Sequence, residues 1–477
     1  MANELFDLGM IGMGVMGRNL LLNMADHGFK VLGYNKSAEK IAALEADATP
    51  GTTVKGTTTL EGLIQQLHVP RKIMLLVPAG DAVDQVIESL LPLIDKGDII
   101  IDGGNSHYTD TLRRNTYLKE KGYYFIGVGV SGGEEGARTG PSIMPGGDKD
   151  AYAFVAPILE AVAAKINNQP CVAYLGNHAA GHYVKMVHNG IEYGIMQLIS
   201  EMYELLHRGL GLTNDELADL FAKWDSEDLN SYLVEITADI FKYQDDRSDN
   251  RLVDMILDKA GAKGTGKWTS QDAIDLPVPI PTIDMAVTMR NISSFKDDRV
   301  AAAKLYGRTS DNKLDGNKEE FIGKVHDALY FTILISYVQG LAMLQKASKA
   351  LNMEIPMPEV VKVWRGGCII RSSMLDIFTT AFEKDPSIPN LLLDADIAEL
   401  FKAKEASVRE LVVEGIKGKF PMGALLASLS YYDAYLTENL PTNLIQAQRD
   451  YFGAHTYQRK DENNGPFYHT EWMKVQL

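Results

Sequence analysis

The sequence predicts an α/β protein in which a doubly wound, largely parallel sheet domain precedes a large all-α domain and an extended C-terminal tail. Apolar, strand-like runs alternate with helix-like stretches through residues 1–175. No proline occurs in residues 171–275 or 282–354, where patterns of helical period dominate. The 477 residues suffice for about three domains. We place these domains at residues 1–177, 178–440 and 441–477.

Six apolar runs are expected to form the strands of the sheet. Helix-like stretches lie between most of them, which favours parallel pairing through crossover helices. Ligands of such sheets bind beyond the carboxyl ends of the strands. The expected strands are Phe6–Ile11, Val31–Tyr34, Lys72–Val77, Asp98–Asp102, Tyr123–Gly127 and Cys171–Leu175.

Clusters of small and polar residues follow three of these strands. Turn chemistry alone can explain the glycines, but clusters at three strand ends favour loops that face a ligand. The residues that we assign to such loops are Val77, Pro78, Ala79, Asn105, Ser131, Gly132 and Gly133.

A turn with the spacing G-x-G-x-x-G joins the first strand to the first helix. Gly12 permits the tight turn, Gly14 lets the backbone approach a pyrophosphate, and Gly17 lets helix and strand pack closely. The phosphates would lie on the helix N-terminus. We therefore predict a Rossmann-type dinucleotide site formed by Gly12, Met13, Gly14, Val15, Met16 and Gly17.

The end of the second strand indicates which dinucleotide binds. An NAD site has an acidic residue there, to accept from the ribose 2′-hydroxyl. This chain instead has Asn35, Lys36 and Ser37. These side chains suit a 2′-phosphate, with Lys36 as the point charge, so we predict NADP. The same residues can also simply begin the next helix, with Ser37 as its cap.

Four polar side chains share one face of an otherwise apolar helical segment. Lys185, His188, Asn189 and Glu192 are separated by three, four and seven positions, and a helix has about 3.6 residues per turn. A buried lysine and glutamate are costly unless they are compensated, which favours a functional site. The alternative is a satisfied core network or a charged stripe that faces a groove.

Composition limits the classes of partner. The net charge of −16 argues against nucleic acid and anionic membranes. No apolar run is expected to span a bilayer, and the first strand begins too near Met1 for a signal peptide. The two cysteines are far apart, so we expect neither a disulfide framework nor a thiolate metal site. We expect a cytoplasmic protein.

No metal site is predicted. His178 and His182 are four residues apart but lack the intervening glutamate of a zinc-protease motif, so they are expected to be ordinary helix residues.

The helical region contains a faint internal repeat. When the segment from Lys185 is displaced onto Lys324, the apolar positions correspond but the polar face does not. If the repeat is real, only its first copy keeps a site. After residue 441 the chain is aromatic and polar without clear helical period, which favours a tail that docks on its own or a neighbouring subunit over a frayed terminus.

Three motifs resemble those of the β-hydroxyacid dehydrogenases: the glycine-rich start, Val130-Ser131-Gly132-Gly133, and the spacing Gly181-x-x-x-Lys185-x-x-x-Asn189. Within that family the chain is most similar to the long-form, decarboxylating 6-phosphogluconate dehydrogenases. Glu192-Tyr193 and two longer segments, residues 364–372 and 449–455, carry this closer likeness, which covers essentially the whole chain.

Two positions depart from that pattern. Gly14 stands where many members have alanine, at little cost. Lys36 replaces a frequent arginine, which can weaken the grip on the 2′-phosphate and make the preference for NADP less complete.

The resemblance implies oxidation of 6-phosphogluconate to ribulose 5-phosphate and CO2 with reduction of NADP+, a reaction of the pentose phosphate pathway. Lys185 would be the base and then the cation at the C3 oxygen, provided that burial lowers its pKa, and Glu192 would protonate C1 of the enediol. The ammonium would replace a metal. Residues expected to orient the substrate are Asn105, Ser131, Gly132, Gly133, His188 and Asn189.

The resemblance also implies a phosphate clamp and a homodimer that exchanges tails. Lys263-Gly264-Thr265-Gly266-Lys267 is by itself a basic, glycine-rich loop suited to a phosphate, although it lacks P-loop spacing. The implied clamp residues are Tyr193, Lys263, Thr265, Arg290 and, from the tail of the partner subunit, Arg449 and His455.

Two other functions stay open at this point. A dehydrogenase for a shorter hydroxyacid would share the glycines and Lys185, but it would need neither the clamp nor so long a chain. A dinucleotide-sensing regulator without turnover would need no buried lysine and glutamate.

Overall fold

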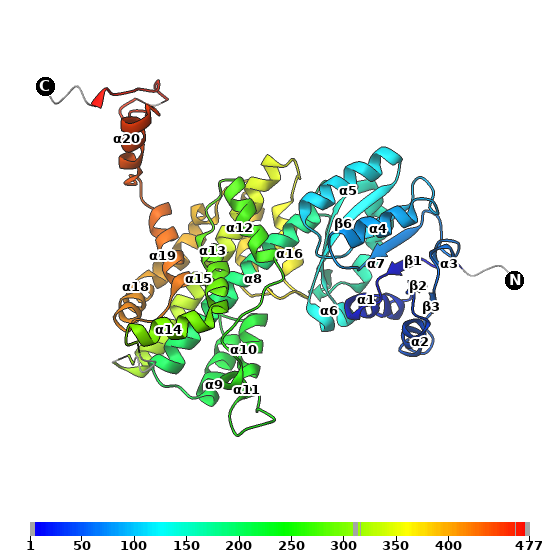
Figure 1. The fold of residues 1–477 in the computed structure, drawn as a ribbon, viewed down its shortest axis with the longest axis horizontal. Coiled ribbons are helices and arrows are strands. Elements are labelled where there is room, and N and C mark those ends of the chain that lie inside the picture. The colour runs from blue at the N-terminus through cyan, green and yellow to red at the C-terminus, as the bar shows by residue number, and fades with distance from the viewer. Residues whose placement is uncertain (1–4, 309–312, 315, 463, 473–477) are drawn as a thin grey trace. The chain divides into compact units, whose positions relative to one another are not determined.

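A seven-stranded sheet forms the N-terminal part of the protein (Figure 1). The computed structural model describes residues 5–308, 313–314, 316–462 and 464–472. The strand order is β3-β2-β1-β4-β5-β6-β7, and every pairing is parallel except β6 with β7. The strands are β1 (Leu8–Ile11), β2 (Val31–Tyr34), β3 (Val54–Thr57), β4 (Lys72–Leu75), β5 (Ile99–Asp102), β6 (Tyr124–Ser131) and β7 (Ser142–Gly147).

Five of the six expected strands are confirmed, with ends shifted by a few residues. The sixth, Cys171–Leu175, is wrong, because only Val172 pairs there, as an isolated bridge to Ile143 of β7. Two strands of the seven-stranded sheet, β3 and β7, were not expected. β3 has lysine and glycine at its centre, and β7 contains Pro145 and two glycines, residues that ordinarily argue against a strand.

Helices cover both faces of the sheet. α1 (Val15–Asp26) and α7 (Lys149–Val162) pack with alternate residues of the strands in one apolar core. α3 (Leu60–Ile64), α4 (Asp81–Leu90) and α5 (Tyr108–Lys121) pack on the other face. Because both faces are covered, β1, β2 and β5 are buried along nearly their whole length rather than at alternate residues. Two further helices belong to this part, α2 (Ala38–Ala46) and α6 (Gly133–Thr139), as does a hairpin of β8 (Lys165–Ile166) and β9 (Gln169–Pro170).

The following region is helical, as expected, and two long helices run through its core. α8 (Ala180–Glu204) continues as a π-helical turn at Leu205–Gly209, and α15 (Lys318–Ala350) packs against it. A Cβ atom on Gly340 would lie 2.5 Å from Ile191, so glycine permits this close contact. The expected repeat relates these two helices and stays a prediction. The other helices are α9 (Asn214–Asp225), α10 (Tyr232–Lys242), α11 (Leu252–Met255), α12 (Thr265–Asp275), α13 (Pro281–Ser294), α14 (Lys296–Leu305), α16 (Met357–Trp364), α17 (Leu375–Lys384), α18 (Ala395–Lys417) and α19 (Gly423–Tyr435).

One helix departs from the expectation that no segment is apolar enough to span a bilayer. α15 is long and apolar enough by composition, but 89% of its most apolar window is buried inside the protein. Its composition is therefore explained by its place in the core.

The chain forms two compact units, residues 1–428 and 429–477. The second unit contains α20 (Thr442–Gly453), so the expectation that the tail lacks helical period is wrong for its first part. Beyond α20, the tail folds around Asp450, which is fully buried. Its carboxylate accepts hydrogen bonds from Thr456 N (2.9 Å), His469 Nδ1 (3.0 Å), Thr470 N (3.0 Å) and Trp472 Nε1 (2.9 Å).

Candidate active site

Helix α8 lies directly on the backbone of β6 and β7. A Cβ atom on Gly181 would lie 2.3 Å from Gly127 O and 2.4 Å from Met144 O. One turn further along, a Cβ atom on Gly129 would lie 2.4 Å from Cβ of Lys185. Because glycines stand at these contacts, the helix approaches closely enough to bury the lysine beside the carboxyl end of β6.

The polar residues expected on one face of α8 form a connected group with Ser131, which ends β6. His188 Nε2 is 3.2 Å from Ser131 Oγ, and His188 Nδ1 is 3.1 Å from Asn189 Oδ1. Since the amide oxygen can only accept, Nδ1 carries the proton and Nε2 accepts from the serine hydroxyl. Glu192 Oε2 lies 3.9 Å from His188 Nδ1. The structure thus brings together residues 131, 188, 189 and 192.

Burial shifts the titratable groups of this face towards their neutral forms. Lys185 is 7% exposed, and burial lowers its pKa, opposed by the nearby charge of Glu192. Burial raises the pKa of Glu192, opposed by Lys185 and Arg290. The pKa of His188 is well below its usual value, because of burial and then the positive charge of Lys185. Groups with such shifts in one cleft are candidates for acid–base work.

The loop after β5 faces α8 and α12 across a narrow cavity. Asn105, Lys185, Asn189 and Thr265 line this cavity together with Trp268. Its volume is about 10 Å³, which is room for about one water molecule.

Aromatic residues hold the β5 loop against α12. The rings of His107 and Trp268 meet edge to face with centroids 4.9 Å apart. The hydroxyls of Tyr108 and Tyr183 both donate to the carboxylate of Asp272, which links α5, α8 and α12. Nothing in the sequence indicated these residues, because their partners are 89 and 164 positions away.

The residues expected to clamp a phosphate lie around the N-terminus of α12. The Arg290 guanidinium stacks 3.5 Å above the centroid of the Tyr193 ring. A Cβ atom on Gly266 would lie 2.4 Å from that ring, so the first turn of α12 packs on Tyr193. Gly264 caps α12 with φ +98, and exposed Lys263 precedes it. Lys263 and Arg290 are therefore cationic residues close to the N-terminus of α12, an end of a helix that favours anions.

The other two expected clamp residues belong to the second unit. Arg449 lies on α20 and is exposed, and its Nη1 donates to Gln446 Oε1 at 3.1 Å. His455 follows the helix, is exposed, and contacts the Phe452 ring edge to face.

The glycine turn has the geometry that its spacing predicts. Gly12 has φ +106, a conformation that favours glycine, and a Cβ atom there would lie 2.4 Å from Leu76 O. Gly14 is the N-cap of α1 and has open space beside it. A Cβ atom on Gly17 would lie 2.0 Å from Gly12 O, so this glycine keeps α1 against the turn itself.

The residues after β2 combine two roles. Ser37 Oγ accepts from Lys40 N at 3.4 Å and so caps α2, while Asn35 Oδ1 accepts from Ser37 N at 2.9 Å. Lys36 is exposed beside this cap. The cap and the expected phosphate contacts are compatible, because Lys36 and the helix N-terminus both favour an anion there.

The segment with residues 364–372, which carries part of the family likeness, completes the wall around Ser131. Trp364 is fully buried, and its ring meets that of His188 edge to face at 5.8 Å. Ile369 N donates to Ser131 Oγ at 3.5 Å. A Cβ atom on Gly132 would lie 2.6 Å from Gly367 O, so glycine at 132 lets the segment approach.

Within the described part of the chain, no group of three or more His, Cys, Asp or Glu residues could hold a metal ion. His182 lies in α8 and contacts Thr111 Oγ1 through Nδ1 at 2.6 Å. His178 is not a helix residue, as the sequence suggested, but lies in the turn before α8 with φ +57.

A glycine-rich dinucleotide turn, followed by a helix that buries a lysine beside a carboxyl group, defines a dinucleotide-dependent dehydrogenase. Two family models match the chain: the NAD binding domain of 6-phosphogluconate dehydrogenase over residues 7–176, and the 6-phosphogluconate dehydrogenase C-terminal domain over residues 181–472. The chain belongs to the 6-phosphogluconate dehydrogenase family.

Relatives match over nearly their whole length. The chain is 50% identical to the decarboxylating 6-phosphogluconate dehydrogenase of Lactococcus lactis subsp. lactis, covering 98% of each chain. It is also 50% identical to the NADP(+)-dependent, decarboxylating 6-phosphogluconate dehydrogenase of Bacillus subtilis, covering 98% of this chain and 99% of that one. The solved 6-phosphogluconate dehydrogenase of Plasmodium falciparum, studied in its apo form and with NADP+ and 6-phosphogluconate, superposes with a TM-score of 0.95 at 46% identity, covering 98% of this chain and 100% of that one.

Proposed function

We propose that the protein oxidises and decarboxylates 6-phosphogluconate to ribulose 5-phosphate and CO2 with reduction of NADP+. The observation that carries the proposal is the burial of Lys185 and Glu192 on one face of α8, at the carboxyl end of a dinucleotide-binding sheet. The relatives named above, one of which is NADP(+)-dependent, support the reaction and the cofactor.

NADP+ would lie across the glycine turn of residues 12–17, with its 2′-phosphate at Asn35, Lys36 and Ser37. The open space beside Gly14 and the exposure of Lys36 fit this placement. The residues at 77–79 and Asn105 would face the nicotinamide, because they follow β4 and β5 at the same edge of the sheet. When bound, the cofactor accepts a hydride from C3 of the substrate.

Lys185 begins the reaction as a neutral amine that takes the proton of the C3 hydroxyl. Burial supports this role, because it lowers the pKa of the amine. The resulting ammonium then hydrogen-bonds the C3 carbonyl oxygen and protonates it as CO2 leaves, which gives an enediol. A cation at that oxygen stabilises the developing negative charge, so the proposed route uses no metal.

Glu192 acts in the last step. Its protonated carboxyl donates to the enediol carbon that was C2 of the substrate and becomes C1 of the product. Lys185 takes back the proton from the oxygen on the former C3, which becomes the C2 ketone of ribulose 5-phosphate. The pair begins as amine and carboxylic acid and ends as ammonium and carboxylate. Both pKa shifts support the starting forms, since burial favours the neutral state of each group. Proton transfer from Lys185 to Glu192 would reset the site.

The remaining polar groups would orient the substrate. Ser131, the backbone N–H groups of Gly132 and Gly133, Asn105, His188 and Asn189 would hold the carboxylate and the C2 and C3 oxygens. The phosphate would lie against Tyr193, Lys263, Thr265 and Arg290, at the N-terminus of α12.

The proposed enzyme is a homodimer in which each tail completes the substrate site of the other subunit. A groove of about 680 Å³ runs along residues of α8 and α13 and past Arg290. Its lining includes the apolar Ile256, Leu257 and Ile292, which are 62%, 61% and 43% exposed. Exposed apolar patches of this kind mark interaction surfaces.

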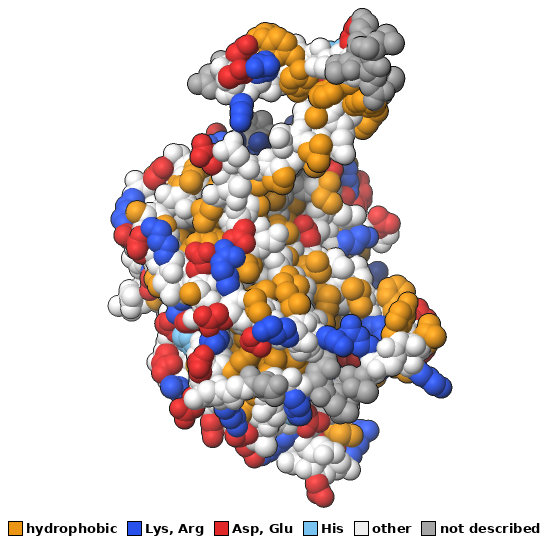
Figure 2. Space-filling model, turned by 90° about the vertical axis from the view of Figure 1, so that its left-hand side faces the viewer, with side chains coloured by type: hydrophobic (Ala, Val, Ile, Leu, Met, Phe, Trp, Pro, Cys, Tyr) orange, Lys and Arg blue, Asp and Glu red, His pale blue; other side chains and the backbone are white. Residues whose placement is uncertain are grey.

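The second unit supplies a matching surface. Hydrophobic side chains lie on the face of this unit that Figure 2 shows. Exposed apolar residues of α20 include Leu444, Ile445, Tyr451 and Phe452, which are 62%, 56%, 54% and 73% exposed. A tail from the partner laid in the groove would bring its Arg449 and His455 to the phosphate beside Arg290. The two buried free thiols, Cys171 and Cys368, suit a reducing cytoplasmic compartment.

The first test is the reaction itself. The purified protein should form NADPH, measured at 340 nm, with one CO2 released for each NADPH, when supplied with 6-phosphogluconate and NADP+. Plain gluconate and hydroxyisobutyrate should react at least ~10²-fold more slowly in kcat/KM, because they lack the phosphate that the clamp binds. NAD+ should be the weaker cofactor. Faster turnover of an unphosphorylated acid would contradict the proposed substrate.

A second test concerns the pH dependence of kcat. At low pH Lys185 and Glu192 are both protonated, and at high pH both are deprotonated, so kcat should fall on either side of an optimum. Glu192→Gln should lower kcat by roughly 10²-fold, the usual effect of removing an acid–base group. In this variant kcat should no longer fall at high pH. The amide does not titrate, and Lys185 is converted more fully to the neutral amine, its active form, as the pH rises.

Glu160→Gln, an exposed carboxyl on α7, is the control and should keep the wild-type profile. If Glu192→Gln releases ribulose 5-phosphate at an unchanged rate, Glu192 is only a structural residue of α8.

A third test asks whether the tail acts in trans. Arg449→Ala with His455→Ala removes two exposed side chains and leaves α20 and the buried Asp450 contacts intact. The substrate KM should rise by at least ~10-fold through loss of charge-assisted hydrogen bonds, with little change in the NADP+ dissociation constant. Arg459→Ala, another exposed tail arginine, is the control.

Heterodimers then distinguish cis from trans. A subunit with Lys185→Met is combined with a subunit that carries the double tail substitution. Exchange in trans predicts one working site per heterodimer, since the intact tail of the first subunit serves the second. Isolated heterodimers that keep the raised substrate KM of the double tail substitution would place the tail in the site of its own subunit.

A further inference from the structure

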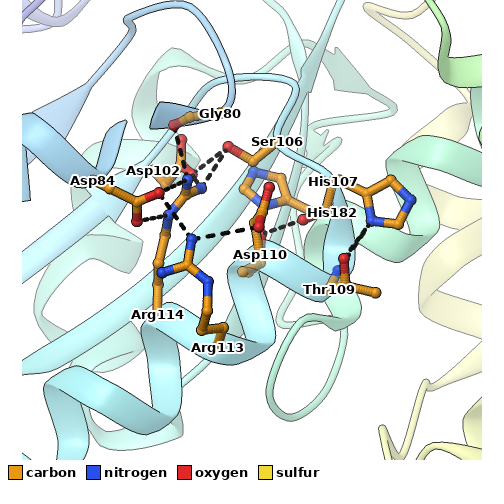
Figure 3. Close-up of polar contacts among 11 residues, drawn as sticks. Gly80, Asp84, Asp102, Ser106, His107, Thr109, Asp110, Arg113, Arg114 and His182 are labelled. Atoms are coloured by element: carbon orange, nitrogen blue, oxygen red, sulfur yellow. Dashed lines mark hydrogen bonds and ion pairs between the residues drawn. The ribbon is translucent and has the colours of Figure 1, made fainter. Parts of the chain in front are cut away.

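A fully buried arginine lies beneath the two loops that the proposed function assigns to the cofactor and the substrate. Arg114 is on α5 and is 1% exposed. Its Nε and Nη2 donate to the two carboxylate oxygens of Asp84 at 2.8 and 3.0 Å, and Nη2 also donates to Gly80 O at 2.9 Å. Nη1 donates to Ser106 Oγ at 3.2 Å and lies 3.5 Å from Asp102 Oδ2 (Figure 3).

These partners belong to two neighbouring strand ends. Gly80 ends the loop after β4, which carries the residues at 77–79, and it has φ +92. Asp102 ends β5 and organises the next loop, because its carboxylate accepts from Gly104 N at 3.1 Å and from Ser106 Oγ at 2.6 Å. Asn105 stands between these two contacts and is exposed towards the cavity. The guanidinium of Arg114 therefore contacts both the loop after β4 and the loop after β5.

We propose that Arg114 is a positioning residue that fixes the loop of Asn105 relative to the loop of Val77–Ala79, and so sets the alignment of substrate and nicotinamide. This inference rests on the proposed function for the roles of these loops. The arginine touches neither ligand in this arrangement. It acts through its contacts with Ser106, Asp102 and Gly80.

The geometry requires a guanidinium rather than any cation. Arg114 uses three nitrogen atoms in fixed directions, towards a carboxylate on α4, a backbone carbonyl and the β5 loop. A lysine ammonium is a single point and cannot span these partners. The charge is also needed, because a neutral substitution would leave the fully buried carboxylate of Asp102 without its cationic partner.

The next residue of the same helix offers a matched control. Arg113 donates to Asp84 at 2.8 Å and to Asp110 at 3.4 Å, but its side chain is 55% exposed. Both of its partners are helix carboxylates, whereas those of Arg114 include the two loops. If Arg114 acted only by pairing with Asp84, substitution of Arg114 and substitution of Arg113 would have the same effect.

The test compares Arg114→Lys with Arg113→Lys in the full-length dimer. We expect Arg114→Lys to lower kcat by roughly 10²-fold, the cost of misplacing a reacting group by about 1 Å. The NADP+ dissociation constant, measured by protein fluorescence without substrate, should rise several-fold. The substrate KM should change by less than about 3-fold, since the phosphate clamp lies on other elements. Arg113→Lys should stay within about 2-fold of the wild type in every constant.

Ser106→Ala is the second variant, because it removes the hydroxyl link while both buried charges remain. It should lower kcat in the same direction with a smaller effect, and its thermal unfolding should stay close to that of the wild type. Equal constants for Arg114→Lys and Arg113→Lys would overturn the proposal. If Arg114→Lys does not fold, a normal kcat in Ser106→Ala overturns it instead.

The NADP+ dissociation constants are compared without turnover. A wild-type enzyme that fails to act on 6-phosphogluconate would therefore refute the proposed function and leave this comparison valid.

Discussion

The close approach of α8 to the backbones of β6 and β7 is the constraint on which the site depends. Gly127, Gly129, Gly146 and Gly181 stand where helix and strands meet, and a Cβ atom on any of them would lie within 2.9 Å of an atom across the contact. The approach places Lys185 against β6 and sets His188 within reach of Ser131. A helix held further out would leave the amine in water, where its pKa is ordinary and it cannot serve as a base near neutral pH.

Burial gives Lys185 and Glu192 the protonation states that the proposed base and acid need. The same low-dielectric surroundings lower the pKa of Lys185 and raise that of Glu192, so each group favours the form that the first and last proton transfers need. The chain has a net charge of −16, so binding of the proposed anionic substrate would depend on local cations and helix N–H groups rather than on the overall field. Arg290 is connected with both the proposed phosphate site and the acid. It stacks on Tyr193, and its positive charge opposes the rise in the pKa of Glu192.

Local patterns in the sequence predict much of this, and contacts over long separations account for what they miss. The apolar runs of β2 and β5, the glycine turn and the polar face of α8 have periods and spacings that are visible within a few residues. β7 could not be found in this way, because Pro145 and its glycines fit only beside β6, where the strand is antiparallel and α8 approaches. Cys171–Leu175 shows the opposite case, an apolar run that packs without a partner strand apart from one bridge. Arg114 and Asp272 are ordinary charged residues in the sequence and are recognisable only from their buried partners.

The measurement that tests the account most directly is a single turnover of Lys185→Met, because methionine keeps the length of the side chain and removes the amine. NADP+ and 6-phosphogluconate should bind within a few-fold of their wild-type affinities, while NADPH formation within one turnover should be slower by at least ~10²–10⁴-fold. Lys223→Met, at an exposed position of α9, should behave as the wild type. A near-normal rate of NADPH formation in Lys185→Met would contradict the account, since the buried amine would then not be the base.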